Sequence, residues 1–256
     1  MCGRFTLRIS PDVIAQMFDV SIGLDSVADF RPRYNVAPTT PVLCIREPAP
    51  PSSVSASSTT ANTPAASTEA SAGQRELFLA RWGLVPSWAK DRTIAASCIN
   101  ARSDTVDKRP AFRAAFKKRR CVVVAEGFFE WRRGDKQPFY ISLRSGRPMP
   151  FAGLWEWWPG DGTDGPFESC TICTTDGNAF MGELHDRMPV ILPEDAIGHW
   201  LARNVVDPTE VKPMLSQLPG ELMQAWPVDR RVGNVRNEGP ELIEPVQSSA
   251  EDQPSV

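Results

Sequence analysis

The chain has 256 residues, of which 41% are hydrophobic, so it can bury the core of one large domain or two small ones. Its net charge of −3 excludes a global basic field, so a nucleic-acid site would need positive charge concentrated locally. No apolar run is long enough to cross a bilayer, and the start of the chain lacks the apolar region of a signal peptide, so we expect a cytoplasmic protein with reduced thiols.

The first third of the chain predicts strands interrupted by one unusual segment. Residues 2–9 predict a strand, and Ser10-Pro11 is typical of the start of a short helix. Residues 33–38 are predicted to be irregular and to lead into a strand at 41–45. Residues 47–74 are rich in Ser, Ala, Thr and Pro, which predicts a flexible low-complexity insertion. A strand at 76–83 should pair with the strand before the insertion, because loop closure costs little more for a longer loop.

The remaining chain predicts more strands than helices. Strands are expected at 121–125, 139–143, 150–158, 167–175 and 188–192, and helices at 110–118, 176–184, 193–203 and 208–218. Residues 247–256 are expected to form a disordered tail. Since strands and helices do not alternate regularly, we predict a single α+β domain over residues 2–246. Its sheet should be mainly antiparallel and barrel-like, with short peripheral helices.

Six cysteines are present, two of them as the pair Cys170-x-x-Cys173. A structural zinc site needs four ligands, and the chain has only two histidines to add to such a pair. The pair also lies in a predicted strand, which would place the two thiols on opposite faces. We therefore interpret them as strand cysteines and expect neither a metal nor another cofactor.

Cys2 is the first candidate for chemistry. Aminopeptidases remove Met1 when the second residue is small, which would leave an amine and a thiol on adjacent carbons. An α-amino group has an ordinary pKa near 8, so part of it is a neutral nucleophile at physiological pH. Together the two groups could attack one aldehyde in succession and close a five-membered thiazolidine. Its position alone favours the other interpretation, that Cys2 is a small buried residue near a frayed terminus.

Two further segments carry polar side chains suited to a ligand. Asn100 offers a donor and an acceptor, and Arg102 offers a planar fork for phosphate or carboxylate. The segment 102–120 is strongly basic, and Arg109, Arg113 and Lys117 would share one helix face. This face could track phosphates, or it could be an ordinary solvated surface.

Acid–base candidates come from two more segments. Glu126 and Glu130 lie among aromatic residues, which disfavours the carboxylate anion and suits proton transfer. The aromatic residues themselves could form core or a platform for base stacking. His185 lies in a polar segment before a predicted strand, whereas His199 lies in a predicted helix, so His185 is the better candidate.

Several short motifs together resemble one family. In chain order they are Cys2-Gly3-Arg4-Phe5, Tyr34-Asn35-Val36-Ala37-Pro38, Trp82-Gly83-Leu84-Val85-Pro86, Asn100-Ala101-Arg102, Gly127-Phe128-Phe129-Glu130-Trp131, His185-Asp186-Arg187-Met188-Pro189 and Val232-Gly233-Asn234-Val235. The set resembles the SRAP family of SOS-response-associated peptidases, or abasic-site processing proteins. The match runs from residue 2 to about residue 246 and omits the insertion and the tail.

The resemblance implies a function and a catalytic set. It implies a thiazolidine crosslink between Cys2 and the ring-opened sugar of an abasic site in single-stranded DNA, preceded by removal of Met1. Asn100 would position the sugar or the terminal amine, and Glu130, now preferred over Glu126, would move protons. His185 would assist ring opening, Schiff-base chemistry and reversal of the crosslink.

The expected partner is single-stranded DNA with an abasic site, and we expect a monomer that meets no membrane, binds no metal and is nucleoid-associated when bound to DNA. DNA contacts are expected from Arg4, Asn35, Pro38, Trp88, Arg102, Arg109, Arg113, Trp131 and Thr174.

Two other functions compete with this one. One is an amidohydrolase or protease that uses Cys2 as an N-terminal nucleophile. The other is a non-covalent single-strand binding module that does not need Cys2.

Overall fold

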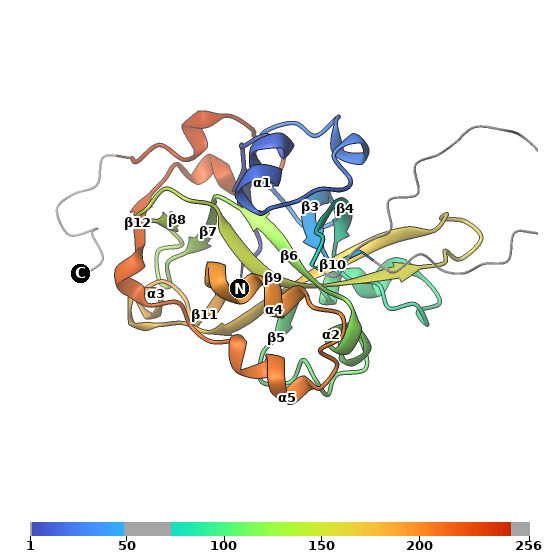
Figure 1. Cartoon of the computed structure of the whole chain (residues 1–256). Helices are drawn as coiled ribbons and strands as arrows, with labels where there is room; N and C mark the ends of the chain where they lie inside the picture. The colour runs from blue at the N-terminus through green and yellow to red at the C-terminus, as the bar shows by residue number, and fades with distance from the viewer. Residues whose placement is uncertain (1, 49–72, 247–256) are drawn as a thin grey trace, which may run out of the picture.

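The body of the protein is built around a closed ring of five strands, seen in a computed structural model that describes residues 2–48 and 73–246 (Figure 1). The ring consists of β3 (Pro41–Arg46), β4 (Glu76–Trp82), β6 (Arg120–Ala125), β9 (Met149–Trp158) and β10 (Phe167–Asp176). It runs in the order β10-β4-β3-β6-β9, and β9 pairs again with β10 to close it. Only the contact of β10 with β4 is parallel within the ring.

Two short strands extend this sheet at β10. They are β5 (Asn100–Arg102), which runs parallel to β10, and β11 (Arg187–Pro189), which runs antiparallel to it. Because β10 has ten residues, it can pair with four different strands along its length. It therefore brings residues near 100 and near 187 to one region of the molecule.

A second, antiparallel sheet carries the N-terminus. Its order is β12 (Met223–Pro227), β8 (Pro138–Leu143), β7 (Gly127–Trp131), β1 (Phe5–Leu7) and β2 (Arg33–Val36). Glu126 alone separates β6 from β7, so the chain passes from the barrel to this sheet at one residue. The Glu126 carboxylate accepts hydrogen bonds from the backbone of Arg8 and Ile9 and from the Arg8 guanidinium, which fixes the end of β1 at this corner.

The helices are short and lie at the periphery (Figure 1). They are α1 (Pro11–Met17), α2 (Arg113–Lys118), α3 (Ala179–Gly182), α4 (Ile197–Leu201) and α5 (Pro208–Val211). The 3₁₀ turns are Asp25–Val27, Arg92–Ser97, Glu194–Ala196, Lys212–Met214, Gly220–Leu222, Arg230–Gly233 and Pro240–Leu242. Within the described ranges, no helix is long and apolar enough to span a membrane.

The predicted α+β fold with a barrel-like, mainly antiparallel sheet is confirmed. The helix start at Ser10-Pro11 is also confirmed, because the Ser10 hydroxyl accepts from the Val13 backbone. The predicted pairing across the insertion is present, with Arg46 opposite Glu76. The insertion and the tail themselves fall mostly on residues 49–72 and 247–256, outside the described residues.

Several expectations about elements were wrong, among them the helix at 208–218, which ends at Val211, and the strand at 188–192, which is Arg187–Pro189. Residues 33–36 form the edge strand β2 where an irregular segment was predicted, because β1 provides a pairing partner for them. The helix predicted at 110–118 begins at Arg113, and no side chain caps its start. The helix predicted at 176–184 contracts to Ala179–Gly182, which Asn178 caps.

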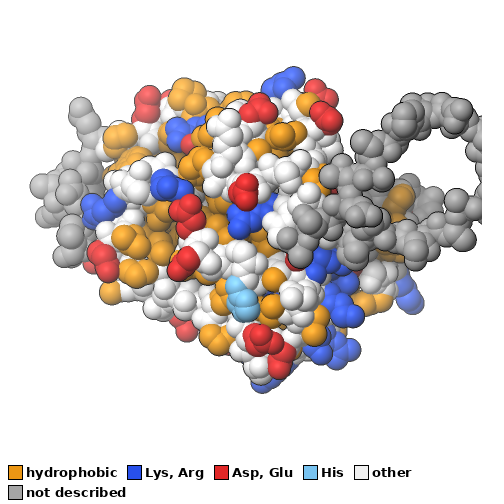
Figure 2. All heavy atoms as spheres, viewed as in Figure 1, with side chains coloured by type: hydrophobic (Ala, Val, Ile, Leu, Met, Phe, Trp, Pro, Cys, Tyr) orange, Lys and Arg blue, Asp and Glu red, His pale blue; other side chains and the backbone are white. Residues whose placement is uncertain are grey.

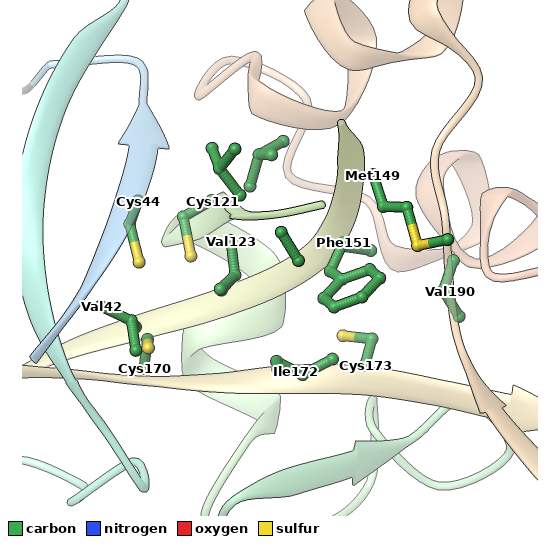
Figure 3. Close-up of a cluster of buried hydrophobic side chains, with 14 of the residues drawn as sticks. Val42, Cys44, Cys121, Val123, Met149, Phe151, Cys170, Ile172, Cys173 and Val190 are labelled. Atoms are coloured by element: carbon green, nitrogen blue, oxygen red, sulfur yellow. The ribbon is translucent and has the colours of Figure 1, made fainter. Parts of the chain in front are cut away.

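The interior of the barrel is lined by aliphatic residues, aromatic residues and thiols (Figure 3). Cys44, Cys121 and Cys170 come from three different strands, and the thiol of Cys44 is hydrogen-bonded to the other two. Cys170 and Cys173 are both buried in β10, as the strand interpretation predicted. Among the described residues, no group of three or more His, Cys, Asp or Glu side chains is arranged to hold a metal ion.

Candidate functional site

Pairing of β1 with β7 brings the N-terminus to Glu130. Phe5 lies opposite Phe128, and the Phe129 backbone N–H donates to the Arg4 carbonyl at 2.9 Å. Continuing this antiparallel register places Gly3 beside Glu130, so Cys2 follows immediately. Cys2 is fully buried in the chain, which begins with Met1.

Asn100 reaches the same place from β5. Its Nδ2 donates a hydrogen bond to the Cys2 carbonyl oxygen at 2.9 Å, although the two residues are 98 positions apart. The side chain is only 6% exposed, and its Oδ1 has no hydrogen-bond partner among the described residues. A buried acceptor without a partner costs free energy, so Asn100 is suited to receive a hydrogen bond from a bound molecule.

Glu130 is the buried carboxyl group of the site, at 3% exposure. Burial raises its pKa above the ordinary value, and the charge of His185 opposes that shift. Burial, followed by the charge of Glu130, raises the pKa of the Cys2 thiol. The site thus holds a carboxyl group whose proton is easily retained beside a thiol that stays neutral.

His185 enters the site from the turn between α3 and β11. Its backbone N–H donates to the Met181 carbonyl at 2.7 Å, and its Nδ1 accepts from the Arg187 backbone N–H at 2.9 Å. Gly177 lets this turn approach β10, because a Cβ there would lie 2.7 Å from the His185 carbonyl oxygen. The fold therefore gathers Cys2, Asn100, Glu130 and His185, the four residues predicted to be catalytic, although their roles stay predictions.

Arg4 and Asn35, both predicted to contact DNA, are engaged within the protein. The Arg4 guanidinium donates to Asn35 Oδ1 at 2.8 Å and to the Val232 carbonyl at 2.6 Å. Asn35 is fully buried, and its Nδ2 donates to the carbonyls of Val232, Asn234 and Asn237. In this arrangement both side chains fix the segment 232–237 beside the N-terminus, and their contact with DNA stays a prediction.

The other predicted contacts differ in exposure. Trp88 is 61% exposed and free to stack, whereas Trp131 is half-buried against the cluster that contains Phe129 and Tyr140. Pro38 is half-buried in the turn before β3. Thr174 is fully buried in β10 opposite Arg102, and its Oγ1 has no hydrogen-bond partner among the described residues.

The basic segment divides into a surface part and a structural part. Arg109 and Arg113 are exposed, and Lys and Arg side chains gather at the lower right of Figure 2, where Figure 1 places α2. Arg119 instead pairs with Glu156 at 2.5 Å. Arg120 is 3% exposed and donates to backbone carbonyls at the ends of α2 and α4. Arg119 and Arg120, although part of the basic segment, therefore serve the fold.

Sequence reasoning missed a charged group around His185 and Arg102. Arg102 forms a two-point contact with Asp104, at 3.2 and 2.8 Å. Arg187, which is mostly buried, lies 3.6 Å from Asp104 and 3.4 Å from Asp176. The motif His185-Asp186-Arg187 was the available signal, but no pattern in the sequence singled out its second and third residues.

Comparison with known proteins gives consistent results. A family model described as SOS response associated peptidase (SRAP) matches residues 1–235. "Abasic site processing protein YoqW" of Bacillus subtilis (strain 168) is 36% identical over 247 residues, covering 95% of this chain and 99% of the relative. "Abasic site processing protein HMCES" of Gallus gallus is 33% identical, covering 70% of this chain and 60% of the relative. A crystal structure of a protein from Bacteroides thetaiotaomicron has a TM-score of 0.78 at 22% identity, covering 96% of this chain and 100% of that one, and so shows the same fold.

Proposed function

The chain belongs to the SRAP family, and on that premise we propose that it processes abasic sites in single-stranded DNA by bonding covalently to them through Cys2. The family relatives carry abasic-site processing in their names. The observation that best supports the proposal is the hydrogen bond from Asn100 to the Cys2 carbonyl, because it fixes the backbone of Cys2 beside Glu130.

Removal of Met1 would start the sequence of reactions. Hydrolysis of the bond between Met1 and Cys2 frees the α-amino group of Cys2 and supplies the second nucleophile. We propose that Glu130 assists this hydrolysis, since burial raises its pKa and so favours a protonated carboxyl group that can donate a proton and take one up again. This step would account for the word peptidase in the family description.

The crosslink then forms in two steps. The amine adds to the aldehyde carbon of the ring-opened sugar, and loss of water gives a Schiff base. The Cys2 sulfur next adds to the imine carbon, while the thiol proton passes to the nitrogen, which closes a thiazolidine. Because burial and Glu130 keep the Cys2 thiol neutral, the amine is the group that attacks first. A Schiff base at this carbon would also permit lyase-type chemistry.

The proposed DNA surface combines a stacking residue with cations. Trp88 is an exposed aromatic side chain, and Arg102 is exposed at the end of β5. Arg109 and Arg113 would bind phosphates of the flanking strand. Local cations of this kind are what a chain with net charge −3 needs to bind a polyanion.

A crosslinking assay tests the proposal. Single-stranded oligonucleotide with one abasic site is incubated with the protein and separated on a denaturing gel, after intact mass has shown that Met1 is absent. A heat-stable shifted band is expected with the natural chain and with Cys121→Ala, a change at another fully buried cysteine, but not with Cys2→Ala. A band that survives in Cys2→Ala, or no band with the natural chain, would overturn the proposal. Native binding without any covalent band would favour a non-covalent binding module, and turnover of small amides would favour an amidohydrolase.

A further inference from the structure

The imidazole of His185 has two neighbours that make opposite demands on the same nitrogen. The Arg187 backbone N–H donates to Nδ1 at 2.9 Å, which requires a lone pair on Nδ1. Oδ1 of Asp186 also lies 2.9 Å from Nδ1, and a carboxylate oxygen is attracted there only when Nδ1 carries a proton. The protonation of this nitrogen is therefore decided by competition between a backbone donor and a carboxylate.

Asp186 is held in place by a cation from the second sheet. Its Oδ2 lies 2.9 Å from Nη2 of Arg133, the second residue after β7, which is the strand that carries Glu130. Desolvation raises the pKa of Asp186, but the hydrogen bond and the charge of Arg133, together with the charge of His185, bring the pKa below its usual value, so the carboxylate stays ionised. One oxygen is thus directed to Arg133 and the other to His185.

We propose that Asp186 is a positioning residue that holds the proton on Nδ1 of His185 and thereby makes Nε2 the nitrogen that exchanges protons during the reaction. With a proton on Nδ1 and a lone pair on Nε2, the ring is a base at Nε2. When Nε2 takes up a proton, the resulting cation is stabilised by Asp186 on one side. This inference rests on the proposed function, in which His185 moves protons.

The alternative arrangement shows why the carboxylate matters. Without Asp186, the Arg187 N–H keeps the lone pair of Nδ1 directed at itself, and the neutral ring carries its proton on Nε2. Such a ring has no lone pair at Nε2 and cannot act as a base there. A proton taken up by this ring would go to Nδ1, on the side of the Arg187 backbone N–H.

Other charges around the ring favour the same arrangement. Glu130 on β7 interacts electrostatically with His185, so a second carboxyl group lies near the imidazole. Arg133 and Arg187 are both engaged by carboxylates, namely Asp186, Asp104 and Asp176. Arg102, which is paired with Asp104, is also under the influence of Asp186. The carboxylates thus compensate the cations that surround the ring.

Nitrogen NMR of the protein alone tests the inference without DNA. The chain has two histidines, so histidine labelled with ¹⁵N gives two rings, and His199→Gln assigns them. At a pH where the ring is neutral, His185 in the natural chain should carry its proton on Nδ1. In Asp186→Ala and Asp186→Asn it should move to Nε2, with the His199 signals unchanged. A proton already on Nε2 in the natural chain, or no change in either variant, would overturn the inference.

Crosslinking kinetics supply the functional readout. Asp186→Asn should slow crosslink formation by about tenfold or more at saturating DNA, with the dissociation constant for DNA unchanged. The matched control is Asp135→Asn, since Asp135 is also exposed but forms its ion pair with Arg132. Equal rates in Asp186→Asn and the natural chain would contradict the positioning role. Absence of any crosslink in the natural chain would instead overturn the proposed function, and the NMR result would still decide the tautomer.

Discussion

The protein buries cysteines in two regions, and the regions differ in what surrounds the sulfur atoms. Inside the barrel, Cys44 has the thiols of Cys121 and Cys170 as its hydrogen-bond partners, among aliphatic and aromatic side chains (Figure 3). At the N-terminus, Cys2 is equally buried but lies beside Asn100 and Glu130. Burial alone therefore does not distinguish a structural thiol from a reactive one.

Polar groups make the distinction. The barrel thiols interact with one another, so replacing one of them changes the packing of the barrel interior. Near Cys2, the fold tolerates the buried carboxyl group of Glu130 and, on Asn100, an amide oxygen without a partner among the described residues. Burying a carboxyl group costs stability, and so does burying an acceptor that no donor meets. If the comparison is right, changes at the N-terminal site should alter chemistry more than stability, and changes in the barrel should do the reverse.

The largest effect is expected from Glu130→Gln. Losing the group that moves protons should slow crosslinking by about 100-fold or more, as measured by single-turnover rates at saturating DNA. The matched control is Glu156→Gln, which removes another buried carboxyl group, the one paired with Arg119. Comparable slowing in the folded fraction of both variants would remove the distinction between the two regions.

The second effect concerns Arg120, whose guanidinium joins α2 and α4 through backbone carbonyls. Arg120→Met should lower the free energy of unfolding by about 3 kcal/mol, because several buried carbonyls lose their donor. Crosslinking by the folded protein should be unchanged. Urea denaturation measures the free energy of unfolding. If Arg120→Met were as stable as the natural chain but bound DNA more weakly, Arg120 would instead belong to the DNA surface.

The third effect is in the barrel itself. Cys121→Ala should lower the free energy of unfolding by about 1–2 kcal/mol, because it removes a buried sulfur from a packed interior. The crosslink rate should match that of the natural chain. A crosslink rate that fell with this substitution would show that the barrel thiols take part in the chemistry.

The fourth effect is a dependence of stability on pH. Because burial raises the pKa of Glu130 above 4.5, the ionised group is costly in the folded state, and stability is lost as pH rises through the folded pKa. The free energy of unfolding of Glu130→Gln should therefore exceed that of the natural chain by about 1 kcal/mol near pH 8, and the difference should disappear near pH 4. Denaturation of both proteins at the two pH values measures this difference. A difference that is the same at pH 4 and pH 8 would contradict a raised pKa for Glu130.

The smallest effect concerns the exposed cations of the basic segment. Replacing both Arg109 and Arg113 by Ala should reduce the slope of log affinity against log salt by about 1, because two phosphate contacts are lost. The double change Arg31→Ala/Arg144→Ala removes two other exposed arginines and serves as the control. An equal reduction in both double variants would mean that the net charge of the protein sets the salt dependence, and that Arg109 and Arg113 make no specific phosphate contacts.

Sequence patterns located most of the long strands, because alternating β-branched and aromatic residues between turn residues indicate them directly. They missed β2, β5, β7 and β12, which have three to five residues each and depend on their partners for stability. The predicted helices were longer than the observed ones. The helix predicted at 110–118, for example, begins only at Arg113, and no side chain caps its first turn. Short elements are decided by tertiary pairing.

The sequence by itself determined which groups could be reactive and, through its motifs, which family the chain resembles. Only the tertiary structure decided that β5, β7 and the turn before β11 deliver Asn100, Glu130 and His185 to the N-terminus. It also separated Arg120 from the exposed arginines. The physical reason is that reactivity at these groups depends on burial and on neighbours far apart in the chain, which strand register and packing set and local sequence does not.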